Sequence, residues 1–82
     1  MYYKSFVIQA LFRVARMKLA SVVRSFTWRL DDGRTYTTVN PPIGTIVQFQ
    51  EYYHEVVVYF PGYVTGADIP RYVFNLHFRV LE

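Results

Sequence analysis

The stretch Ile69-Pro70-Arg71-Tyr72-Val73-Phe74-Asn75-Leu76-His77-Phe78-Arg79-Val80-Leu81-Glu82 alternates between apolar and polar side chains. Large apolar side chains stand at every second position: Tyr72, Phe74, Leu76, Phe78 and Val80. Side chains that form hydrogen bonds lie between them: Arg71, Asn75, His77 and Arg79. Because successive side chains of an extended chain point to opposite sides, the pattern predicts a strand over residues 69–82 with one buried face and one cationic face in solvent.

A second strand is predicted over residues 20–30, where apolar side chains again favour every second position. The triplet Asp31-Asp32-Gly33 follows it directly. Because an Asp-Gly pair supplies the positive φ angles that tight turns need, we expect the chain to fold back into a strand over residues 34–39. The two strands then form a β-hairpin.

Prolines and glycines divide the remaining sequence into loops and strands. Asn40-Pro41-Pro42-Ile43-Gly44 predicts a rigid loop, because neither proline can donate to a strand ladder. Extended structure is expected to resume over 45–50 and to continue through 51–60, which contains three consecutive valines. A turn-rich connection with Pro61-Gly62 and Gly66-Ala67-Asp68 precedes the closing strand. Residues 6–19 fit both the helical and the strand period, so the residues themselves leave that segment open.

The composition favours one small β-rich domain over residues 1–82. Eight Tyr, seven Phe and one Trp supply large buried areas, and aromatic residues favour pleated sheet. The absence of cysteine excludes disulfides, thiol nucleophiles and thiolate zinc sites. The formal charge of +3 is uneven, because residues 1–39 hold seven of the nine cations and only two of the six carboxylates. The first half of the chain is therefore the basic half.

Several segments, taken in order, resemble the C-terminal OB-fold domain of ATP-dependent DNA ligases. They are Ser5-Phe6-Val7-Ile8, Met17-Lys18-Leu19-Ala20-Ser21-Val22-Val23, Leu30-Asp31-Asp32-Gly33-Arg34-Thr35-Tyr36, Pro42-Ile43-Gly44-Thr45-Ile46-Val47-Gln48-Phe49, Gly66, Ile69-Pro70-Arg71-Tyr72 and Phe78-Arg79-Val80. The resemblance implies a mostly β fold: a small OB-like five-stranded antiparallel barrel, closed or partly open, with room for one short helix. It also implies that residues 6–19 open the barrel as a strand.

The sequence departs from the ligase pattern where the catalytic motifs of that family stand. Only the arginine of the family's Arg-x-Asp-Lys-type motif is matched, by Arg79-Val80-Leu81-Glu82, and no Lys-x-Asp-Gly adenylation motif occurs. His54 and His77 lack metal-ligand spacing, and no serine or threonine is marked as a nucleophile. We therefore expect no enzymatic activity, no catalytic residues, no metal and no cofactor.

The cationic residues predict a protein that binds nucleic acid along its phosphate backbone without base specificity, with DNA favoured over RNA. Barrels of this kind hold the backbone in a cationic groove and stack bases on aromatic rings. The expected phosphate contacts are Arg29, Arg34, Arg71, His77 and Arg79, with Arg13, Arg16 and Lys18 beside them. The expected stacking platforms are Tyr36, Tyr52, Tyr53, Tyr59 and Tyr63.

The alternative hypothesis is a protein-interaction or inhibitor module, because the aromatic 52–63 stretch carries more apolar area than one small barrel buries easily. Its expected contact residues are Tyr52, Tyr53, Tyr59, Phe60 and Tyr63. A homo-oligomer, an accessory subunit or a viral or phage factor would all fit such a surface. The opening apolar stretch is too short and too polar to span a membrane, and it lacks the pattern of a signal peptide. We therefore expect a cytoplasmic or other intracellular protein, including a viral protein in a host cell.

Overall fold

The fold comes from a computed structural model, described here for residues 17–31 and 33–81. The described chain is mostly β, with antiparallel sheets and one short helix, which confirms the predicted fold class. The elements are β1 (Lys18–Val22), β2 (Trp28–Asp31), β3 (Tyr36–Val39), β4 (Ile46–Glu51), β5 (Glu55–Tyr59), β6 (Ala67–Pro70), α2 (Arg71–His77) and β7 (Phe78–Leu81). The alternatives for residues 6–16 lie outside the described residues.

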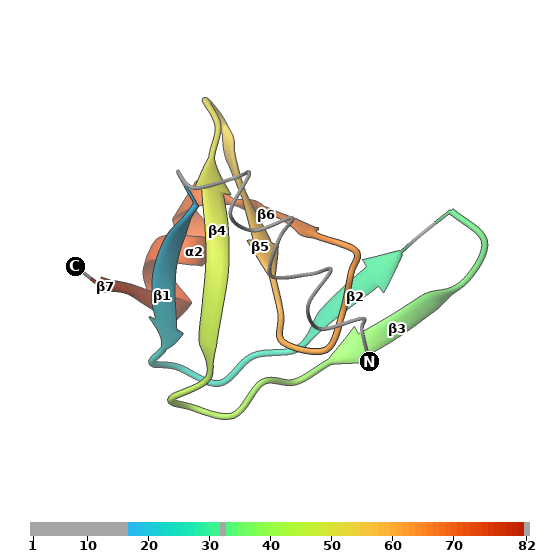
Figure 1. Cartoon of the computed structure of the whole chain (residues 1–82), viewed down its shortest axis with the longest axis horizontal. Coiled ribbons are helices and arrows are strands. Elements are labelled where there is room, and N and C mark those ends of the chain that lie inside the picture. The colour runs from blue at the N-terminus through green and yellow to red at the C-terminus, as the bar shows by residue number, and fades with distance from the viewer. Residues whose placement is uncertain (1–16, 32, 82) are drawn as a thin grey trace.

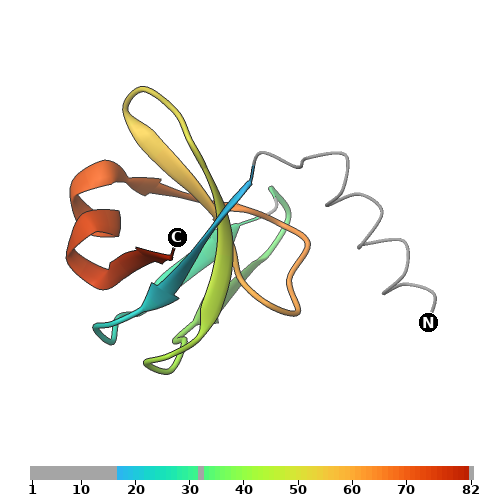
Figure 2. The same ribbon diagram turned by 60° about the vertical axis from the view of Figure 1, so that its left-hand side comes forward.

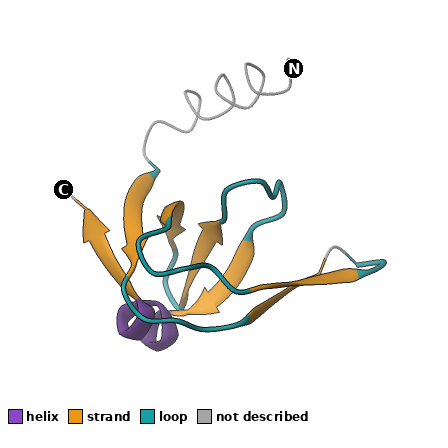
Figure 3. Cartoon of the chain, turned by 90° about the horizontal axis from the view of Figure 1, so that it is seen from below, coloured by secondary structure: helices purple, strands orange, loops and turns teal. Residues whose placement is uncertain are grey.

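Five strands form one antiparallel sheet in the order β6-β5-β4-β1-β7, and β2 pairs with β3 in a separate two-stranded sheet. Figure 1 shows β1 and β4 side by side at the centre, with the β2–β3 hairpin projecting away from β7. The same projection is visible at the right of Figure 3. The hairpin is therefore connected to the main sheet by the segments 23–27 and 40–45, and its inward residues Leu30 and Val39 belong to the buried core.

The core lies on one face of the five-stranded sheet. Alternate residues of four strands are buried there: Ala20 and Val22, Val47 and Phe49, Val56 and Val58, Ala67 and Ile69. Helix α2 packs against β5, β6 and β7, and Figure 2 shows it at one side of the sheet, where it joins β6 to β7. It places the ring of Phe74 4.8 Å from the ring of Phe49 and 4.8 Å from the ring of Phe78.

The prediction of one continuous strand over residues 69–82 is wrong. Strand β6 ends at Pro70, residues 71–77 form α2, and only Phe78–Leu81 return to the sheet as β7. Pro70 cannot donate a hydrogen bond to the ladder, and its φ of −56° suits the entry to a helix. In consequence Tyr72 and Leu76 are 75% and 51% exposed rather than buried.

The strand predicted over residues 20–30 is interrupted. Strand β1 ends at Val22, and the N–H groups of Val23 and Arg24 both donate to the carbonyl of His77, at 2.8 and 3.3 Å. These bonds hold the chain against the end of α2 while it leaves the main sheet, and extended structure resumes at Trp28. Because of the break, residues 20–30 contribute to strands of two different sheets.

The hairpin predicted after residue 30 is confirmed, with a longer connection than a two-residue turn. Asp31 pairs with Tyr36, so the second strand begins two residues later than expected. Gly33 has a φ of +94°, and its N–H donates to Asp31 Oδ1 at 2.9 Å. The loop over 40–44 and the strand after it are also confirmed.

The strand predicted through residues 51–60 is interrupted by a turn. Strand β4 ends at Glu51, and the N–H of Tyr52 donates to the carbonyl of Glu55 at 2.9 Å. The chain therefore reverses direction at 52–54 and returns as β5. This reversal places the two ends of the 51–60 segment far apart along the sheet, because β5 runs its full length between the 52–54 turn and residue 60.

Gly66 is required by close packing. A Cβ atom at Gly66 would lie 2.7 Å from Cγ1 of Val57 and 2.8 Å from Cε1 of Tyr59, closer than real Cβ contacts. We expect Gly66→Ala to destabilise the fold by about 1–3 kcal/mol, as crowding does in well-packed regions. Urea unfolding measures this change.

A Val57→Ala background is the control for the Gly66 prediction. It removes the Cγ1 atom that the new methyl group would meet first. The Gly66→Ala substitution should therefore cost less in that background than in the native sequence, because the two sites are in contact. An equal cost in both backgrounds would show that crowding against Val57 is not the cause.

Candidate ligand groove

A groove runs between β3 and the loop that joins β5 to β6. It consists of two hollows, of about 80 and 370 Å³, which have Tyr63 in common as a lining residue. The first hollow is lined by Leu30, Thr35, Tyr36, Thr37, Tyr63 and Thr65, and the second by Thr38, Val39, Asn40, Pro41, Pro42, Thr45, Phe60, Pro61 and Tyr63. We call this feature the β3 groove. Its larger hollow has the size of a typical ligand site, roughly 300–1,000 Å³.

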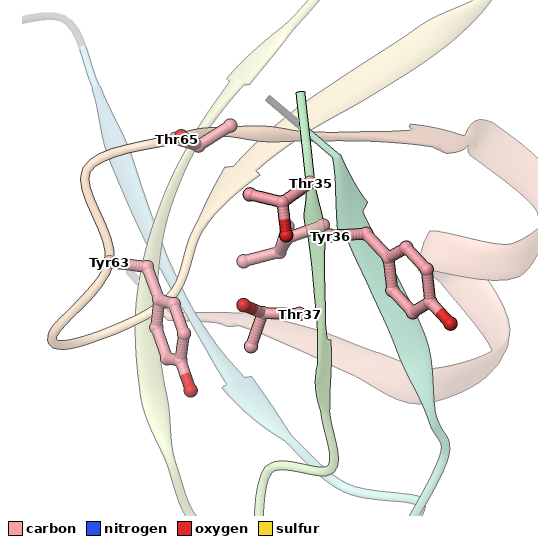
Figure 4. Close-up of a pocket in the computed structure, with 6 residues that line it drawn as sticks. Thr35, Tyr36, Thr37, Tyr63 and Thr65 are labelled. Atoms are coloured by element: carbon pink, nitrogen blue, oxygen red, sulfur yellow. The ribbon is translucent and has the colours of Figure 1, made fainter. Parts of the chain in front are cut away.

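Figure 4 shows how the side chains lie around the first hollow. Thr35 and Thr37 turn toward Tyr63 on the opposite wall, whereas the ring of Tyr36 turns the other way. This alternation follows from the extended conformation of β3. Thr37 lies opposite Leu30 in the hairpin, so both are on the side that faces the β5–β6 loop.

The wall opposite β3 is held by a turn in the β5–β6 loop. The N–H of Tyr63 donates to the carbonyl of Phe60 at 3.1 Å, across Pro61 and Gly62. Phe60 is buried, and its ring lies 6.3 Å from that of Phe26. The buried ring anchors the loop, while Tyr63 stays 40% exposed at the junction of the two hollows.

Among the described residues, those that line the β3 groove include no Asp, Glu, Lys, Arg or His. Its polar groups are hydroxyls, one amide and the backbone, and its apolar groups come from Leu30, Val39 and the proline, tyrosine and phenylalanine rings. The Oγ1 hydroxyl of Thr45 is already used, because it donates to the carbonyl of Pro42 at 2.7 Å. The groove can therefore hold uncharged groups through hydrogen bonds and ring contacts.

The predicted cations on the hairpin lie outside this groove. The Arg29 guanidinium stacks over the ring of Tyr36 at 4.4 Å and pairs with Asp31 at 3.6 Å. Arg34 is exposed near the tip of the hairpin. Tyr36 and Arg29 are thus on the hairpin face that turns away from Tyr63, and the stacking surface predicted for Tyr36 is already covered on one side.

Two other predicted phosphate contacts are paired with one carboxylate. Glu51 accepts from Lys18 Nζ at 3.4 Å and from Arg71 Nη1 at 3.2 Å. Arg71 also donates to the carbonyl of Tyr52. These bonds join β1, the end of β4 and the first turn of α2, so both cations have a structural role. Exposed pairs of this kind are weak, roughly 0–1 kcal/mol each.

The remaining predicted cations do not share one strand face with Arg71, as the alternation had suggested. His77 is part-buried, with Nδ1 3.0 Å from the carbonyl of Val73 and its ring 4.8 Å from that of Phe26. Arg79 is exposed on β7, opposite Ser21 of β1. The helix separates these positions, which is why the predicted cationic face is absent among them. Arg13 and Arg16 lie outside the described residues.

The aromatic surface predicted over residues 52–63 is divided between two ends of the sheet. Tyr52 and Tyr53 lie at the β4–β5 turn, whereas Tyr63 lies in the β5–β6 loop, at the other end of β5. Phe60 belongs to the core, and Tyr59 is half-buried opposite Gln48. Only Tyr63 and Phe60 of this set line the β3 groove. Of the other residues that line the groove, sequence analysis had singled out Tyr36, as a stacking ring, and the proline loop at 41–42.

The chain was compared with protein-family models, with curated proteins and with solved structures, and none of the three comparisons found a match. The resemblance to the OB-fold domain of DNA ligases therefore stays a prediction. Among the described residues, no helix has the length and apolar character needed to cross a bilayer. Within the same residues, no group of three or more His, Cys, Asp or Glu side chains has the geometry to hold a metal ion.

Proposed function

We propose that this protein is a non-enzymatic interaction module that binds a segment of a partner protein in the β3 groove. The observation that carries the proposal is the groove itself, which has two hollows that share Tyr63 and whose described lining residues include no ionised side chain. Polar hydroxyls beside proline and tyrosine rings suit peptide recognition, because peptides offer uncharged backbone groups and apolar side chains together.

The exposure of Tyr63 supports the same proposal. Tyrosine is enriched at protein interfaces, where its ring packs against a partner and its hydroxyl stays hydrogen-bonded. The neutral lining also disfavours phosphates in this place, since a nucleic-acid channel needs cations along its course. A partner segment would lie between the hairpin and the β5–β6 loop.

Peptides selected from a random display library against the whole protein test this function. The most enriched peptide is titrated into the ¹⁵N-labelled protein, and the amide signals are followed. We expect the largest shifts at residues 35–42 and 60–65, which line the groove. Shifts confined to another surface, or a library without any binder, would contradict the proposal.

Nucleic-acid binding is the second candidate, and one observation favours it. Arg24 and Arg79 are both exposed, and neither forms an ion pair with a described residue. Their backbones lie close together in space, because the Arg24 N–H donates to the carbonyl of His77 and Arg79 follows His77 by two residues. Phosphate groups could therefore meet two cations at this edge of the sheet.

The nucleic-acid candidate predicts binding that weakens as salt is raised from about 50 to 200 mM, because neutralised phosphates release counterions. Anisotropy of labelled oligo-dT and of a labelled duplex measures it. The double variant Arg24→Gln/Arg79→Gln should lower the slope of log K against log salt by about 2. Lys18→Gln, at a cation already paired with Glu51, is the control. Absence of binding at 50 mM would eliminate this candidate.

A further inference from the structure

The outer face of the five-stranded sheet, opposite the core, carries exposed aliphatic side chains. Leu19 and Ser21 alternate with the buried residues of β1, so they lie on this outer face. In the antiparallel register Leu19 is opposite Leu81 of β7, and Ser21 is opposite Ile46 of β4. Directly opposite residues share one face of a sheet. Leu19, Ile46 and Leu81, which are 42%, 45% and 37% exposed, therefore gather there, and we call them the outer patch.

The helix and the hairpin that the structure describes pack on the other side of the sheet. Phe74 of α2 and the hairpin residues Leu30 and Val39 all belong to the core cluster. The residues of the outer patch are also absent from the lining of the β3 groove. An apolar sheet face is normally buried against a second layer of structure. Exposed aliphatic side chains gathered on such a face are typical of an interaction surface.

Two arginines lie at one border of the outer patch. Arg79 is opposite Ser21, so it shares the outer face. Arg24 lies at the same end of the β1–β7 pair, because its N–H donates to the carbonyl of His77 at 3.3 Å. Both arginines are exposed, and neither forms an ion pair with a described residue. Asp68 lies on β6, at the opposite edge of the sheet. The outer patch is thus aliphatic, with a cationic border.

From this arrangement we propose that the outer patch binds an acidic amphipathic helix of a partner protein. The inference goes beyond the β3 groove and concerns a second interaction surface. An amphipathic helix presents an apolar stripe with charged residues beside it, and a helix laid on a sheet face is a common way to bury both. The stripe covers the aliphatic side chains of the outer patch, while carboxylates along one side of the helix meet Arg24 and Arg79.

Charge distinguishes this partner from other occupants of the outer patch. Residues 1–16 of the same chain contain three cations and no carboxylate, so they lack the charge that complements the arginines. A second copy of the chain carries a formal charge of +3 and is repelled. Nucleic acid would pair with the arginines but leave Leu19, Ile46 and Leu81 without an apolar partner. An acidic amphipathic helix complements both parts of the surface.

Titration of a model peptide into the ¹⁵N-labelled protein tests this proposal. The probe is a blocked peptide of leucine and glutamate whose leucines follow the helical spacing i, i+3, i+4, i+7. We expect amide shifts at residues 19–21, 46–48 and 79–81, and an affinity that falls as salt is raised from about 50 to 200 mM. The controls are a scrambled peptide of the same composition and a leucine–lysine peptide of the original order. Both should bind at least about tenfold more weakly.

Substitutions separate the aliphatic part of the surface from its cationic border. Leu19→Thr should weaken binding of the leucine–glutamate peptide roughly three- to tenfold, because it removes aliphatic area and keeps a residue suited to a strand. Val64→Thr is the matched control, at an aliphatic residue that is 75% exposed in the β5–β6 loop. It should change the affinity less than about twofold. Arg24→Gln/Arg79→Gln should weaken binding roughly fivefold at low salt. Melting temperatures show whether each variant is folded.

Several results would overturn the proposal. If the scrambled peptide binds as well as the ordered one, charge alone explains the binding. If the leucine–lysine peptide binds as well, the cationic border has no role. Absence of shifts at about 1 mM peptide, or shifts confined to the β3 groove, also contradicts it. If oligo-dT or phosphatidylserine vesicles shift the amides of the outer patch and the peptide does not, the surface binds nucleic acid or a membrane instead.

Discussion

Replacing Phe74 with alanine is expected to lower the melting temperature by roughly 15 to 30 °C, the shift for a loss of about 3–5 kcal/mol in a domain of this size. The ring of Phe74 is 2% exposed and contacts both Phe49 and Phe78. The substitution leaves a cavity between α2 and the sheet that neighbouring rings can fill only in part. Since small domains are stable by roughly 5–15 kcal/mol in all, much of the protein should be unfolded at 37 °C.

Tyr72→Ala is the matched control, because it removes a similar ring two residues away on the same helix. Tyr72 is 75% exposed, so its loss should cost less than about 0.5 kcal/mol. Thermal and urea unfolding of both variants measure the difference. In a continuous strand over residues 69–82, Tyr72 and Phe74 would share the buried face and the two losses would be similar. Similar losses would therefore contradict helix α2.

Replacing Tyr63 with alanine is expected to weaken binding of the selected peptide by roughly thirtyfold, the effect of losing an interface hot spot of about 2 kcal/mol. Tyr63 is the residue shared by the two hollows, and its ring faces Thr37 across the first of them. Its removal should therefore take away one wall of the whole groove. Calorimetric titration measures the affinity.

Tyr53→Ala is the control for the groove. Tyr53 is 86% exposed and lies at the β4–β5 turn, far along the sheet from Tyr63. Its loss should leave the affinity unchanged within about twofold. Melting temperatures of both variants show whether any effect comes from unfolding. If Tyr53→Ala weakens binding and Tyr63→Ala does not, the partner binds at the β4–β5 turn and the groove proposal is wrong.

Local sequence rules were sufficient where a local interaction determines the structure. The hairpin after residue 30 follows from Gly33, whose positive φ and bond to Asp31 involve neighbouring residues only. The loop at 40–44 follows from prolines that cannot join a ladder. Extended structure over 45–50 was predicted from the residues after the loop, and the structure has β4 there, with Val47 and Phe49 buried.

Local sequence rules failed over residues 69–82, where the spacing of two buried rings fits both a strand and a helix. Phe74 and Phe78 are four residues apart, which places them on one side of a strand and also on one side of a helix. The alternation of Tyr72, Phe74 and Leu76 favoured a strand, whereas the structure buries Phe74 alone of the three. Phe74 packs against Phe49, which is 25 positions away in sequence and outside the reach of local rules. The same holds for the break after Val22, which depends on bonds to His77.

The candidate site was less predictable than the fold. The sequence shows which residues are cationic, but whether a cation is available to bind phosphate depends on the carboxylate that the fold places beside it. Glu51 reaches both Lys18 and Arg71, which are 33 and 20 positions distant. The β3 groove joins residues from the hairpin to residues from the β5–β6 loop, and no motif marks such a pair of segments.

The amino-acid sequence by itself determined a small, cysteine-free, mostly β chain with a hairpin at residues 28–39 and a proline loop after it. These features depend on side-chain periodicity and on φ preferences, which act between near neighbours. Tertiary structure alone decided the helix at Arg71–His77, the ion pairs of Glu51 and the groove beside β3. Those features depend on packing and charge contacts between segments that only folding brings together.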